Sequence, residues 1–500
     1  MIKSDWTYLG LFFIALFSLV LIAEIFRKLF HWQPEASRKF VHVFTGILVS
    51  LTPFALQSMW PMLILGTLFT ILDFVAIRKN LFRGMHGTKR HSYGTVFYPL
   101  SFVILVVLLW DNDKLILVTA MLIMAIADAL ASLVGERVKH PIHLEFGFEA
   151  KSVQGSLTML VSTFMIVALC SLALPQFTPI QLTALQVIWY AVLVAIIATA
   201  CEVISLHGSD NLTVPLGAAF TMHYLFHHTP GDALFFTLGI ILSLLAAIMS
   251  FRFKFLDTGG AIGAFLLGVV VFGIGRLAFT IPILTFFITS SVISNIGKGH
   301  KQKLITIFEK TGKRDLWQVL ANGGLAGALV LTWNYYHLDI FYIFFLGALA
   351  AVTADTWATE IGVLSRTKPV SILNFKTVPP GTSGGITLIG TAGAAAGSLL
   401  LVITGWLTAP PSSVRIIDNK EFVIIMLAGL LASFVDSFLG ATVQAKYRCQ
   451  VCNKITEKTR HCQQPAVHIG GYIWINNDMV NLFCAVSSIL FLLVIRSIVL

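Results

Sequence analysis

The sequence predicts an all-α polytopic membrane protein with about 16 transmembrane helices, and three observations predict this class. Of its 500 residues, 57% are hydrophobic and only 12% are charged, a composition typical of chains that lie in a bilayer. Apolar runs of roughly 18–22 residues recur along the chain, and this length spans a bilayer as a helix. Basic residues cluster in the segments between these runs, as they do in loops on the inner side of a membrane.

We expect the first apolar run to be a span, because it lacks the basic start and the small-residue cleavage site of a signal peptide. The expected spans are residues 7–26, 40–58, 60–77, 93–110, 115–135, 157–174, 183–201, 213–228, 233–251, 256–275, 278–296, 317–335, 340–359, 385–407, 421–441 and 478–497.

The distribution of charge predicts the orientation. If residue 1 lies outside, all but six of the 34 Lys and Arg residues fall in or beside loops on the inner side. The net charge of +10 then belongs to these loops and not to a nucleic-acid interface, because no basic face and no aromatic–basic alternation is present. We expect a multi-pass protein of a bacterial inner membrane, with the bilayer as partner, no nucleic acid, and active sites on the cytoplasmic face.

Two halves that share a sequence pattern are expected. The first covers residues 1–250, and basic residues at Arg252 and Lys254 follow it without a long linker. The second covers residues 251–500, is richer in glycine, and carries a loop with Cys and His at 446–475. Disulfides are not expected, because the loop cysteines fall on the reducing inner side.

Asp128 is the residue around which the first half is organised. It stands in an apolar run, where a charge costs about 2.5–3.5 kcal/mol even on insertion scales, so such residues face polar interiors and mark function. Ser132 and Gly135 follow at i+4 and i+7, on the same helix face. The same pattern recurs at Ala354–Gly362, around Asp355, which suggests two related sites.

The two halves can be aligned further by eye. Gly155–Thr158 then lies opposite Gly384–Thr387, and each segment enters the next span. Glu202 lies opposite Asp436, with the Cys and His loop inserted after the latter. This alignment suggests two copies of one catalytic architecture.

The residue types at the inner ends of the spans suit phosphoryl or nucleotidyl transfer. Neighbouring carboxylates bind a hard cation such as Mg²⁺, which also bridges substrate phosphates. Glycine-rich turns that enter a helix present N–H groups to an anion, and Lys or Arg neutralises charge on a transferring phosphoryl group. Each acid taken alone could instead be a structural tie between helices. No Walker P-loop, protein-kinase motif set or G-x-S-x-G elbow is present.

Cys449-x-x-Cys452 and His461-Cys462 have the composition of a zinc site in one inner loop. The first pair has ordinary zinc-knuckle spacing, whereas two adjacent ligands must both turn towards one metal. We predict a structural Zn²⁺ here and no catalytic role; reduced thiols without metal are the alternative.

Motifs of the first half carry a resemblance to a known family. They are Arg38-Lys39-x-x-His42, the Asp128–Gly135 helix, Lys151-Ser152-x-x-Gly155-Ser156, and Glu202 with Asp210-Asn211-x-x-Val214-Pro215. With these motifs the first half resembles the membrane polyprenol kinases, which include phytol kinase, dolichol kinase and CTP-dependent diacylglycerol kinase.

A second set of motifs lies in the second half. It comprises Gln318–Gly323, Ala354–Gly362, the run Val378–Gly385, Asp436–Gln444 and Asn476-Asn477. With these the second half resembles the family that contains plant phytyl-phosphate kinase, and the Pro-Pro-Gly-Thr-x-Gly-Gly run is the most specific match.

Together these resemblances imply a bifunctional isoprenoid salvage kinase. The first half would phosphorylate a prenyl alcohol of the phytol or geranylgeraniol type, and the second would convert the monophosphate to the diphosphate. CTP as donor and Mg²⁺ as cofactor are implied in the same way.

The resemblances also imply the site residues. The implied catalytic acids are Asp128, Glu202, Asp210, Asp355, Glu360 and Asp436, of which Asp128, Asp355 and Asp436 would hold Mg²⁺. The implied nucleotide- and phosphate-binding residues are Arg38, Lys39, Lys151, Ser152, Gly155, Ser156, Lys298, Arg314, Gly381, Thr382, Gly384 and Gly385. The implied polar supports are His42, Asn211, Asn322, Gln444 and Asn477.

Two other functions remain open at this point. A diacylglycerol or other lipid kinase would share the motifs of the first half but would leave the second half without a purpose. A membrane transporter could use paired intramembrane carboxylates in a duplicated fold, although its acids would lie near mid-span. Glu202 and Asp210 instead lie at or beyond helix ends, which favours chemistry at the membrane surface.

Overall fold

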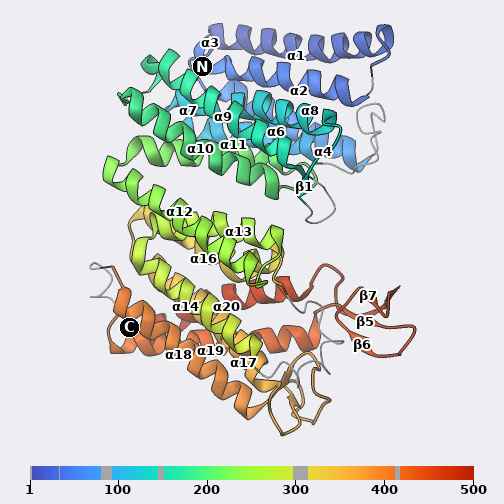
Figure 1. The fold of residues 1–500 in the computed structure, drawn as a ribbon, viewed down its shortest axis with the longest axis vertical. Coiled ribbons are helices and arrows are strands. Elements are labelled where there is room, and N and C mark those ends of the chain that lie inside the picture. The colour runs from blue at the N-terminus through green and yellow to red at the C-terminus, as the bar shows by residue number, and fades with distance from the viewer. Residues whose placement is uncertain are drawn as a thin grey trace. The chain divides into compact units, whose positions relative to one another are not determined.

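The computed structural model describes residues 3–32, 34–79, 93–144, 151–178, 180–296, 313–410 and 417–499, and these are mostly helical. They form two compact units, unit 1 at Met1–Ala233 and unit 2 at Leu234–Leu500 (Figure 1). The helix α12 (Pro230–Arg252) crosses this boundary in its first turn. The boundary expected near residue 250 lies at the opposite end of that helix, because the basic residues there mark the end of a span.

Apolar runs of the sequence form the helices, and each of the expected spans coincides with one. The elements of unit 1 are α1 (Lys3–Leu29), α2 (Pro34–Ser50), α3 (Thr52–Ala55), α4 (Trp60–Arg78), α6 (Gly94–Leu109), α7 (Lys114–Leu122), the π-helical turn η1 (Ile123–Ala127), α8 (Asp128–Arg137), β1 (His143–Leu144), β2 (Lys151–Ser152), α9 (Val153–Ala173), the 3₁₀ turn η2 (Pro175–Phe177), α10 (Ala184–Ile204) and α11 (Asp210–His227).

Unit 2 is built in the same way, with strands only outside the spans. After α12 its elements are α13 (Thr258–Gly268), the π-helical turn η3 (Val269–Ile274), α14 (Arg276–Asn295), α16 (Leu316–Tyr336), α17 (Ile340–Gly362), β3 (Val370–Ser371), β4 (Gly385–Ile386), α18 (Leu388–Thr408), α19 (Asn419–Thr442), β5 (Lys446–Arg448), β6 (Ile455–Thr456), β7 (Arg460–His461), β8 (Gln464–Pro465), β9 (Val467–Gly470) and α20 (Asn477–Val499).

Side-chain caps set where many of these helices begin. Each capping residue is an Asp, Ser or Thr whose side chain accepts a hydrogen bond from a backbone N–H of the first helical turn, which satisfies one of the free donors there. The caps are Asp113, Ser152, Thr183, Asp257, Asp315, Thr387 and Asp418.

Twelve helices of the described residues are long and apolar enough to cross a membrane, which agrees with the expected polytopic class. Of the remaining expected spans, α6 and α13 with η3 are shorter apolar helices. The other two, α2 and α11, carry predicted site residues such as Lys39 and Asp210, and these polar side chains lower their hydropathy. The count of 16 is thus approximate.

The aspartate-bearing helix lies at the centre of each unit. In the apolar 18-residue stretch of each helix, the share of buried residues is 72% for the continuous span Lys114–Arg137, which is made of α7, η1 and α8. It is 67% for α17 and only 11% for α1. In unit 1 this span packs against α2, α6, α9 and α11. In unit 2, α17 packs against α14, α16, α18, α19 and α20. Asp128 and Asp355 therefore lie on helices that are largely buried within their units.

Both units repeat one local arrangement after the central helix. A two-stranded antiparallel pair follows, β1–β2 in unit 1 and β3–β4 in unit 2, and a capped helix comes next. Ser152 Oγ accepts from the Gly155 N–H at 3.1 Å, and Thr387 Oγ1 accepts from the Gly390 N–H at 3.0 Å. Ser152 therefore corresponds to Thr387, and the cap lies at the same place in both units.

This correspondence corrects the alignment made by eye. Gly155 corresponds to Gly390 and not to Gly384, and Gly385 lies in β4 rather than at the entry of α18. The eye alignment matched glycines, whereas the structure matches the cap and the glycine three residues after it.

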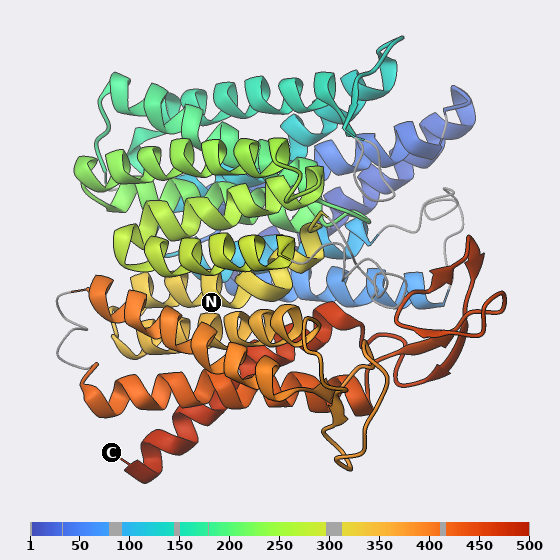
Figure 2. The ribbon, with the colours of Figure 1, turned by 60° about the horizontal axis from the view of Figure 1, so that its bottom comes forward.

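The loop between α19 and α20 forms a small β structure of its own. One sheet has the order β6-β5-β9, and β7 and β8 form a separate hairpin. Figure 2 shows these strands beyond the ends of the two helices. The loop thus stands outside the helical part of unit 2.

Candidate functional sites in the two units

Lys151 lies between two carboxylates at the end of unit 1 where β2 meets the helices. Its Nζ is 2.7 Å from Glu202 Oε1, at the end of α10, and 3.3 Å from Asp210 Oδ2, at the start of α11. The three side chains are only 19%, 7% and 18% exposed. Asp128 interacts electrostatically with all three. We call these four residues the Lys151 cluster.

The charges around Lys151 decide its protonation state. Burial alone would lower the pKa of Lys151, but Asp210, Glu202 and Asp128 together outweigh it and raise the pKa above its usual value. Lys151 is therefore a fixed cation at neutral pH. The cluster holds three acids and one lysine, so the acids outnumber the cation and could bind a further positive charge. Glu202 Oε2 is buried and makes no hydrogen bond to the described residues.

Asp128 begins α8 directly after the π-helical turn η1. Its Oδ2 is 4.0 Å from His42 Nε2, and that nitrogen also lies 3.1 Å from the carbonyl oxygen of Met124 in η1. The ring of Tyr98 lies 4.5 Å from that of His42, centre to centre. The Tyr98 hydroxyl is buried without a hydrogen-bond partner in the described part of the chain. Single π-helical turns often occur at functional sites.

Lys39 ties the start of α2 to the end of α8. Its Nζ is 2.7 Å from Glu136 Oε2, and Ser132 Oγ donates to Glu136 Oε1 at 3.0 Å. Lys39 also interacts electrostatically with Asp128, while Arg38, one residue earlier, interacts with His42. Both predicted cations therefore lie beside the Lys151 cluster; phosphate binding by them stays a prediction.

Ser152 and Gly155 have a structural role that the sequence analysis did not predict. Ser152 caps α9, and a Cβ at Gly155 would stand 2.9 Å from the Ala131 carbonyl oxygen and 3.0 Å from Ser152 Oγ. The glycine thus lets α8 and α9 approach closely. The Gly155 N–H is occupied by the cap, while Ser156 Oγ is buried without a partner among the described residues. Asn211 hydrogen-bonds Asp210 Oδ1 through its backbone N–H at 3.0 Å.

Unit 2 brings together Asp355 of α17 and Asp436 of α19. Their carboxyl groups interact electrostatically, and Asp436 Oδ2 is buried with no partner among the described residues. Two buried carboxylates in contact repel each other unless a proton or a cation lies between them. We call this contact the aspartate pair. The two predicted magnesium ligands of unit 2 are thus neighbours.

Glu360 takes part in a second contact of unit 2. Ser294 Oγ donates to Glu360 Oε1 at 2.7 Å, and Glu360 interacts electrostatically with Arg314. Burial lowers the pKa of Arg314, and Glu360 opposes the change. The Arg314 guanidinium lies 5.7 Å from the ring centre of Phe287. Its backbone bonds Phe255 and Asp257, so its position is fixed.

The glycine-rich run 379–385 forms a compact turn. Gly381 and Gly384 adopt φ of +84° and +80°, and a Cβ at Gly384 would stand 2.5 Å from Ala441 Cβ in α19. Thr382 Oγ1 donates to the Pro379 carbonyl oxygen at 2.7 Å, and the Thr382 carbonyl oxygen accepts from the Gly385 N–H at 3.0 Å. The turn is therefore packed against the helix that carries Asp436.

The remaining predicted supports lie at the ends of α16, α19 and α20. Asn481 Nδ2 donates to Asn322 Oδ1 at 3.5 Å, and Asn477 is the first residue of α20. Gln444 is buried, and its Nε2 has no hydrogen-bond partner in the described ranges. Lys298, a predicted phosphate ligand, lies outside the described residues.

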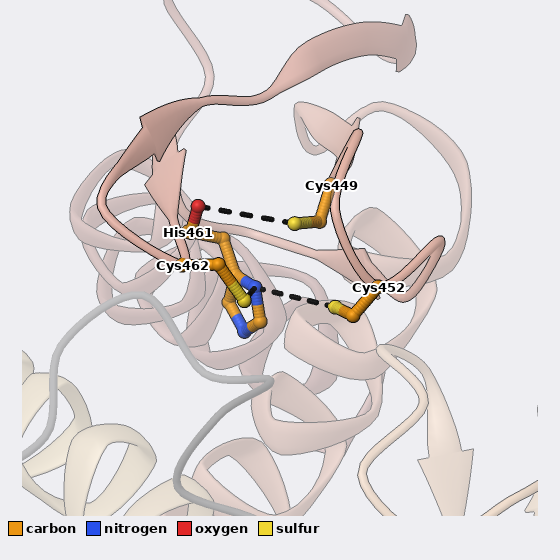
Figure 3. A group of neighbouring side chains, drawn as sticks. All are labelled: Cys449, Cys452, His461 and Cys462. Carbon is orange, nitrogen blue, oxygen red and sulfur yellow. Dashed lines mark hydrogen bonds between the residues drawn. The ribbon is translucent and has the colours of Figure 1, made fainter.

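Cys449, Cys452, His461 and Cys462 converge in the loop between α19 and α20 (Figure 3). Their ligand atoms all lie within 4.8 Å of one another, and no other group of three or more metal-ligating side chains in the described residues meets this condition. Hydrogen bonds lower the pKa of the Cys449 thiol to about 6, chiefly one from the backbone of Cys452, while burial opposes them. A low pKa favours the thiolate that a metal requires.

Several residues near the sites escaped the sequence analysis. Tyr98 lies in an ordinary apolar helix, and Glu136 and Ser383 lie in polar segments with many such residues. Glu457 lies in the Cys and His loop, yet it accepts a hydrogen bond of 2.7 Å from Ser383 and interacts electrostatically with Asp436. Ser383 stands at the variable position of the run Val378–Gly385, and no local pattern marks the others, because only packing brings them to the sites.

The two sites differ in one respect. Lys151 precedes the cap Ser152, whereas the residue before the corresponding cap Thr387 is Ile386. The fixed cation of unit 1 therefore has no counterpart at this place in unit 2.

Comparison with known proteins gives relatives for parts of the chain. A protein of Arabidopsis thaliana named PGR is 36% identical over 44% of this chain and 82% of its own length. A phytol kinase of Synechocystis sp. is 34% identical over 43% of this chain and 89% of its own length. The chloroplastic protein VTE6 of Arabidopsis thaliana is 23% identical over 45% of this chain and 61% of its own length.

No solved structure matches the chain. A family profile described as "Integral membrane protein DUF92" matches residues 241–489. With this match and relatives that are covered over most of their length, the chain belongs to the DUF92 family of integral membrane proteins.

Proposed function

We propose that the chain is a membrane prenol kinase that acts in two steps: unit 1 phosphorylates an isoprenoid alcohol, and unit 2 adds a second phosphoryl group to the monophosphate. The similarity to a protein named phytol kinase supports the first step. The observation that carries the proposal is the repeated arrangement of central aspartate helix, strand pair and capped helix, with buried acids beside it in each unit.

The chemistry of the two acceptors fits the difference between the sites. In the first step the alcohol oxygen attacks the terminal phosphorus of a nucleoside triphosphate, the nucleoside diphosphate leaves, and the hydroxyl proton passes to a base. Asp128 and Asp210 are the carboxylates available for this, and Lys151 offsets the negative charge of the phosphates.

The second step needs no base of this kind. A phosphate monoester has its second pKa near 6, so its attacking oxygen is already ionised at neutral pH. The barrier in the second step comes from the electrostatic repulsion between the phosphate monoester and the nucleotide, which nearby positive charge must offset. Arg314 and those N–H groups of the turn 379–385 that are not bonded within the turn are the groups of unit 2 that we assign to the phosphates.

The acids of both sites fit Mg²⁺. In unit 2 the aspartate pair offers two carboxylates in contact, with Asp436 Oδ2 unpaired within the described chain. In unit 1 Asp128 and Glu202 are carboxylates that interact electrostatically, and Glu202 Oε2 is unpaired within the described chain. When bound, Mg²⁺ would neutralise charge on the phosphoryl oxygens. CTP is the donor we propose, from the resemblance of the motifs.

A membrane setting suits this reaction. The prenyl chain lies in the bilayer and its hydroxyl reaches the surface. Lys151, Glu202 and Asp210 lie at helix ends in unit 1, and Arg314 and the turn 379–385 lie outside the helices of unit 2. We propose that the nucleotide arrives on the side of the basic loops, which is the cytoplasmic face if the protein lies in a bacterial inner membrane.

The test uses purified full-length protein in detergent with phytol or geranylgeraniol, Mg²⁺ and CTP labelled at the γ-phosphate, with products separated by thin-layer chromatography. We expect wild type to form monophosphate and diphosphate. Asp128→Asn should make nothing from the alcohol but still extend added monophosphate, whereas Asp355→Asn should accumulate monophosphate.

Asp113→Asn is the matched control. Asp113 is also buried and belongs to the same central span, but it caps the opposite end, and Asn caps nearly as well as Asp. It should keep both products. Labelling of diacylglycerol instead of prenols would replace the proposal with a lipid kinase, and labelling of no lipid with any nucleotide would favour a transporter.

A further inference from the structure

The Cys and His loop at 446–475 has no part in the phosphoryl transfer proposed above, yet its ligand atoms are already arranged for a metal. His461 Nδ1 lies 3.5 Å from Cys452 Sγ and 3.2 Å from Cys462 Sγ. In a tetrahedral zinc site, Zn–S bonds of about 2.3 Å and Zn–N bonds of about 2.0 Å place nitrogen and sulfur about 3.6 Å apart. The observed spacing is close to this value.

The hairpin β7–β8 explains how two adjacent residues face one metal. Arg460 pairs with Pro465 and His461 with Gln464, which leaves Cys462 and Gln463 as a two-residue turn. Both turn residues have positive φ, 50° and 62°, as in a type I′ turn. The tight turn places the Cys462 thiol back over the His461 ring (Figure 3).

A second turn supplies the other pair of ligands. The Cys449 N–H bonds the Lys454 carbonyl, and the Asn453 N–H bonds the Cys449 carbonyl, both at 3.0 Å. Cys452 therefore lies on a closed turn next to Cys449. The strands around it have two to four residues, and few of their side chains are buried. So small a β structure cannot bury enough apolar surface to be stable alone, and a metal is a usual remedy.

Two residues of the loop outside the hairpin β7–β8 connect the ligands to the site of unit 2. Glu457 lies between the ligands Cys452 and His461, and its Oε1 accepts a hydrogen bond of 2.7 Å from Ser383 in the glycine-rich turn. Lys446 of β5 donates from Nζ to the Ala441 carbonyl at 2.7 Å, beside Gly384. Two side chains of the loop thus contact the turn and the end of α19.

We propose that Cys449, Cys452, His461 and Cys462 bind one Zn²⁺, and that this metal fixes the segment between Cys452 and His461 so that Glu457 holds the turn 379–385 in place beside the aspartate pair. Glu457 is then a positioning residue. The zinc site stands on its own geometry, whereas its effect on catalysis rests on the proposed function of unit 2.

The first experiment measures metal. Full-length protein, purified without chelators from cells supplied with zinc, is analysed by inductively coupled plasma mass spectrometry. Wild type should hold about one Zn²⁺ per chain, and after exchange Co²⁺ should give the intense absorption of tetrahedral thiolate coordination. Cys452→Ser and Cys462→Ser should lose the metal. Cys170→Ser, a buried cysteine of unit 1, should keep it. A zinc-free wild type, or zinc that survives in Cys452→Ser, overturns the site.

The second experiment tests positioning with the prenyl monophosphate as substrate. Glu457→Gln keeps an oxygen that accepts from Ser383, whereas Glu457→Ala does not. We expect KM of Glu457→Ala to rise about tenfold or more with kcat little changed, and Glu457→Gln to restore most of it. Lys454→Ala, at an exposed residue of the same loop, is the control. An unchanged KM in Glu457→Ala rules out positioning. So does a fall in kcat as large as the rise in KM that occurs equally in both Glu457 variants.

Failure of this inference and failure of the proposed function are distinguishable. If wild type holds zinc but never extends the monophosphate, the activity proposed for unit 2 is wrong and the metal site stands. If wild type is zinc-free and makes diphosphate, the activity stands and the metal site is wrong. Conversion of the alcohol to monophosphate by Cys452→Ser would show that the variant chain is folded.

Discussion

Lys151 lies between carboxylates of two different helices in unit 1. Glu202 and Asp210 lie 51 and 59 residues further along the chain, and both contact its ammonium group. A buried ion pair contributes little net stability against an apolar replacement of both partners, but removal of one partner leaves an uncompensated charge. Lys151 therefore matters for folding as well as for the phosphate binding that we propose.

Substitution of Lys151 by methionine tests this dependence. We expect Lys151→Met to destabilise the protein by about 3 kcal/mol or more, because two buried carboxylates lose their partner. It should also abolish phosphorylation of the alcohol while added monophosphate is still extended. Thermal unfolding in detergent and the chromatographic assay measure the two effects.

Two further variants act as controls for this substitution. Lys139→Met, at an exposed residue before β1, should change stability by no more than about 0.5 kcal/mol. Glu202→Gln added to Lys151→Met should restore part of the lost stability, because it removes one unpaired charge. A double variant less stable than Lys151→Met would contradict the ion-pair explanation.

The raised pKa of Lys151 also predicts a pH dependence. A lysine whose pKa is higher in the folded state contributes stability that is fully present below the pKa of an unfolded lysine, about 10.4, and is lost as pH rises through the folded value. The difference in melting temperature between wild type and Lys151→Met should thus stay constant from about pH 6 to about pH 9 and shrink above about 10.4. A gap that narrows between pH 7 and 9 would show that the pKa is not raised.

At the scale of elements, one contact occurs in both units. In unit 1 a Cβ at Gly155 would meet the Ala131 carbonyl and the Ser152 cap, and in unit 2 a Cβ at Gly390 would meet the Ala358 carbonyl and the Thr387 cap. The same three groups thus pack the central helix against the capped helix twice. This detail supports duplication more directly than the shared aspartate pattern does.

Gly155→Ala tests the close approach of α8 and α9. The added methyl would stand 2.9 Å from a backbone oxygen that cannot move freely, so we expect a loss of about 1–3 kcal/mol. Gly10→Ala in α1 is the matched control, since a Cβ there meets nothing within 4 Å and alanine favours a helix by about 1 kcal/mol. Thermal unfolding in detergent should show a lower melting temperature for the first variant only; equal values would refute the contact.

At the scale of the whole molecule, the basic loops predict that both sites face one side of the membrane. Single cysteines at exposed residues test this. A membrane-impermeant maleimide should label Asn112→Cys and His337→Cys from outside, and Lys139→Cys and Lys376→Cys only in inverted vesicles. Wild type provides the background from native cysteines. Labelling of the last two from opposite sides would place the two sites on different faces.

Much of the fold could be predicted because its causes are local. The length of an apolar run decides whether it spans a bilayer, and Asp, Ser and Thr caps decide where helices begin. The acids of the candidate sites stood out for the same reason, since a carboxylate in an apolar run has no packing purpose. The expected alignment of Gly155 with Gly384 shows the limit of such prediction. A match between glycines does not show which residue caps the helix, and the structure aligns Gly155 with Gly390.

The sequence by itself determined the membrane class, the approximate spans and the acids on which the sites are built. Only the tertiary structure decided which partner each acid contacts. Glu202 and Asp210 contact Lys151, Asp355 interacts with Asp436, and Glu457 contacts Ser383, which lies 74 residues earlier in the chain. The physical reason is that membrane helices are apolar on every side, so the period of the sequence does not mark the face that turns inward. That face is chosen by small residues and polar contacts between helices distant in the chain.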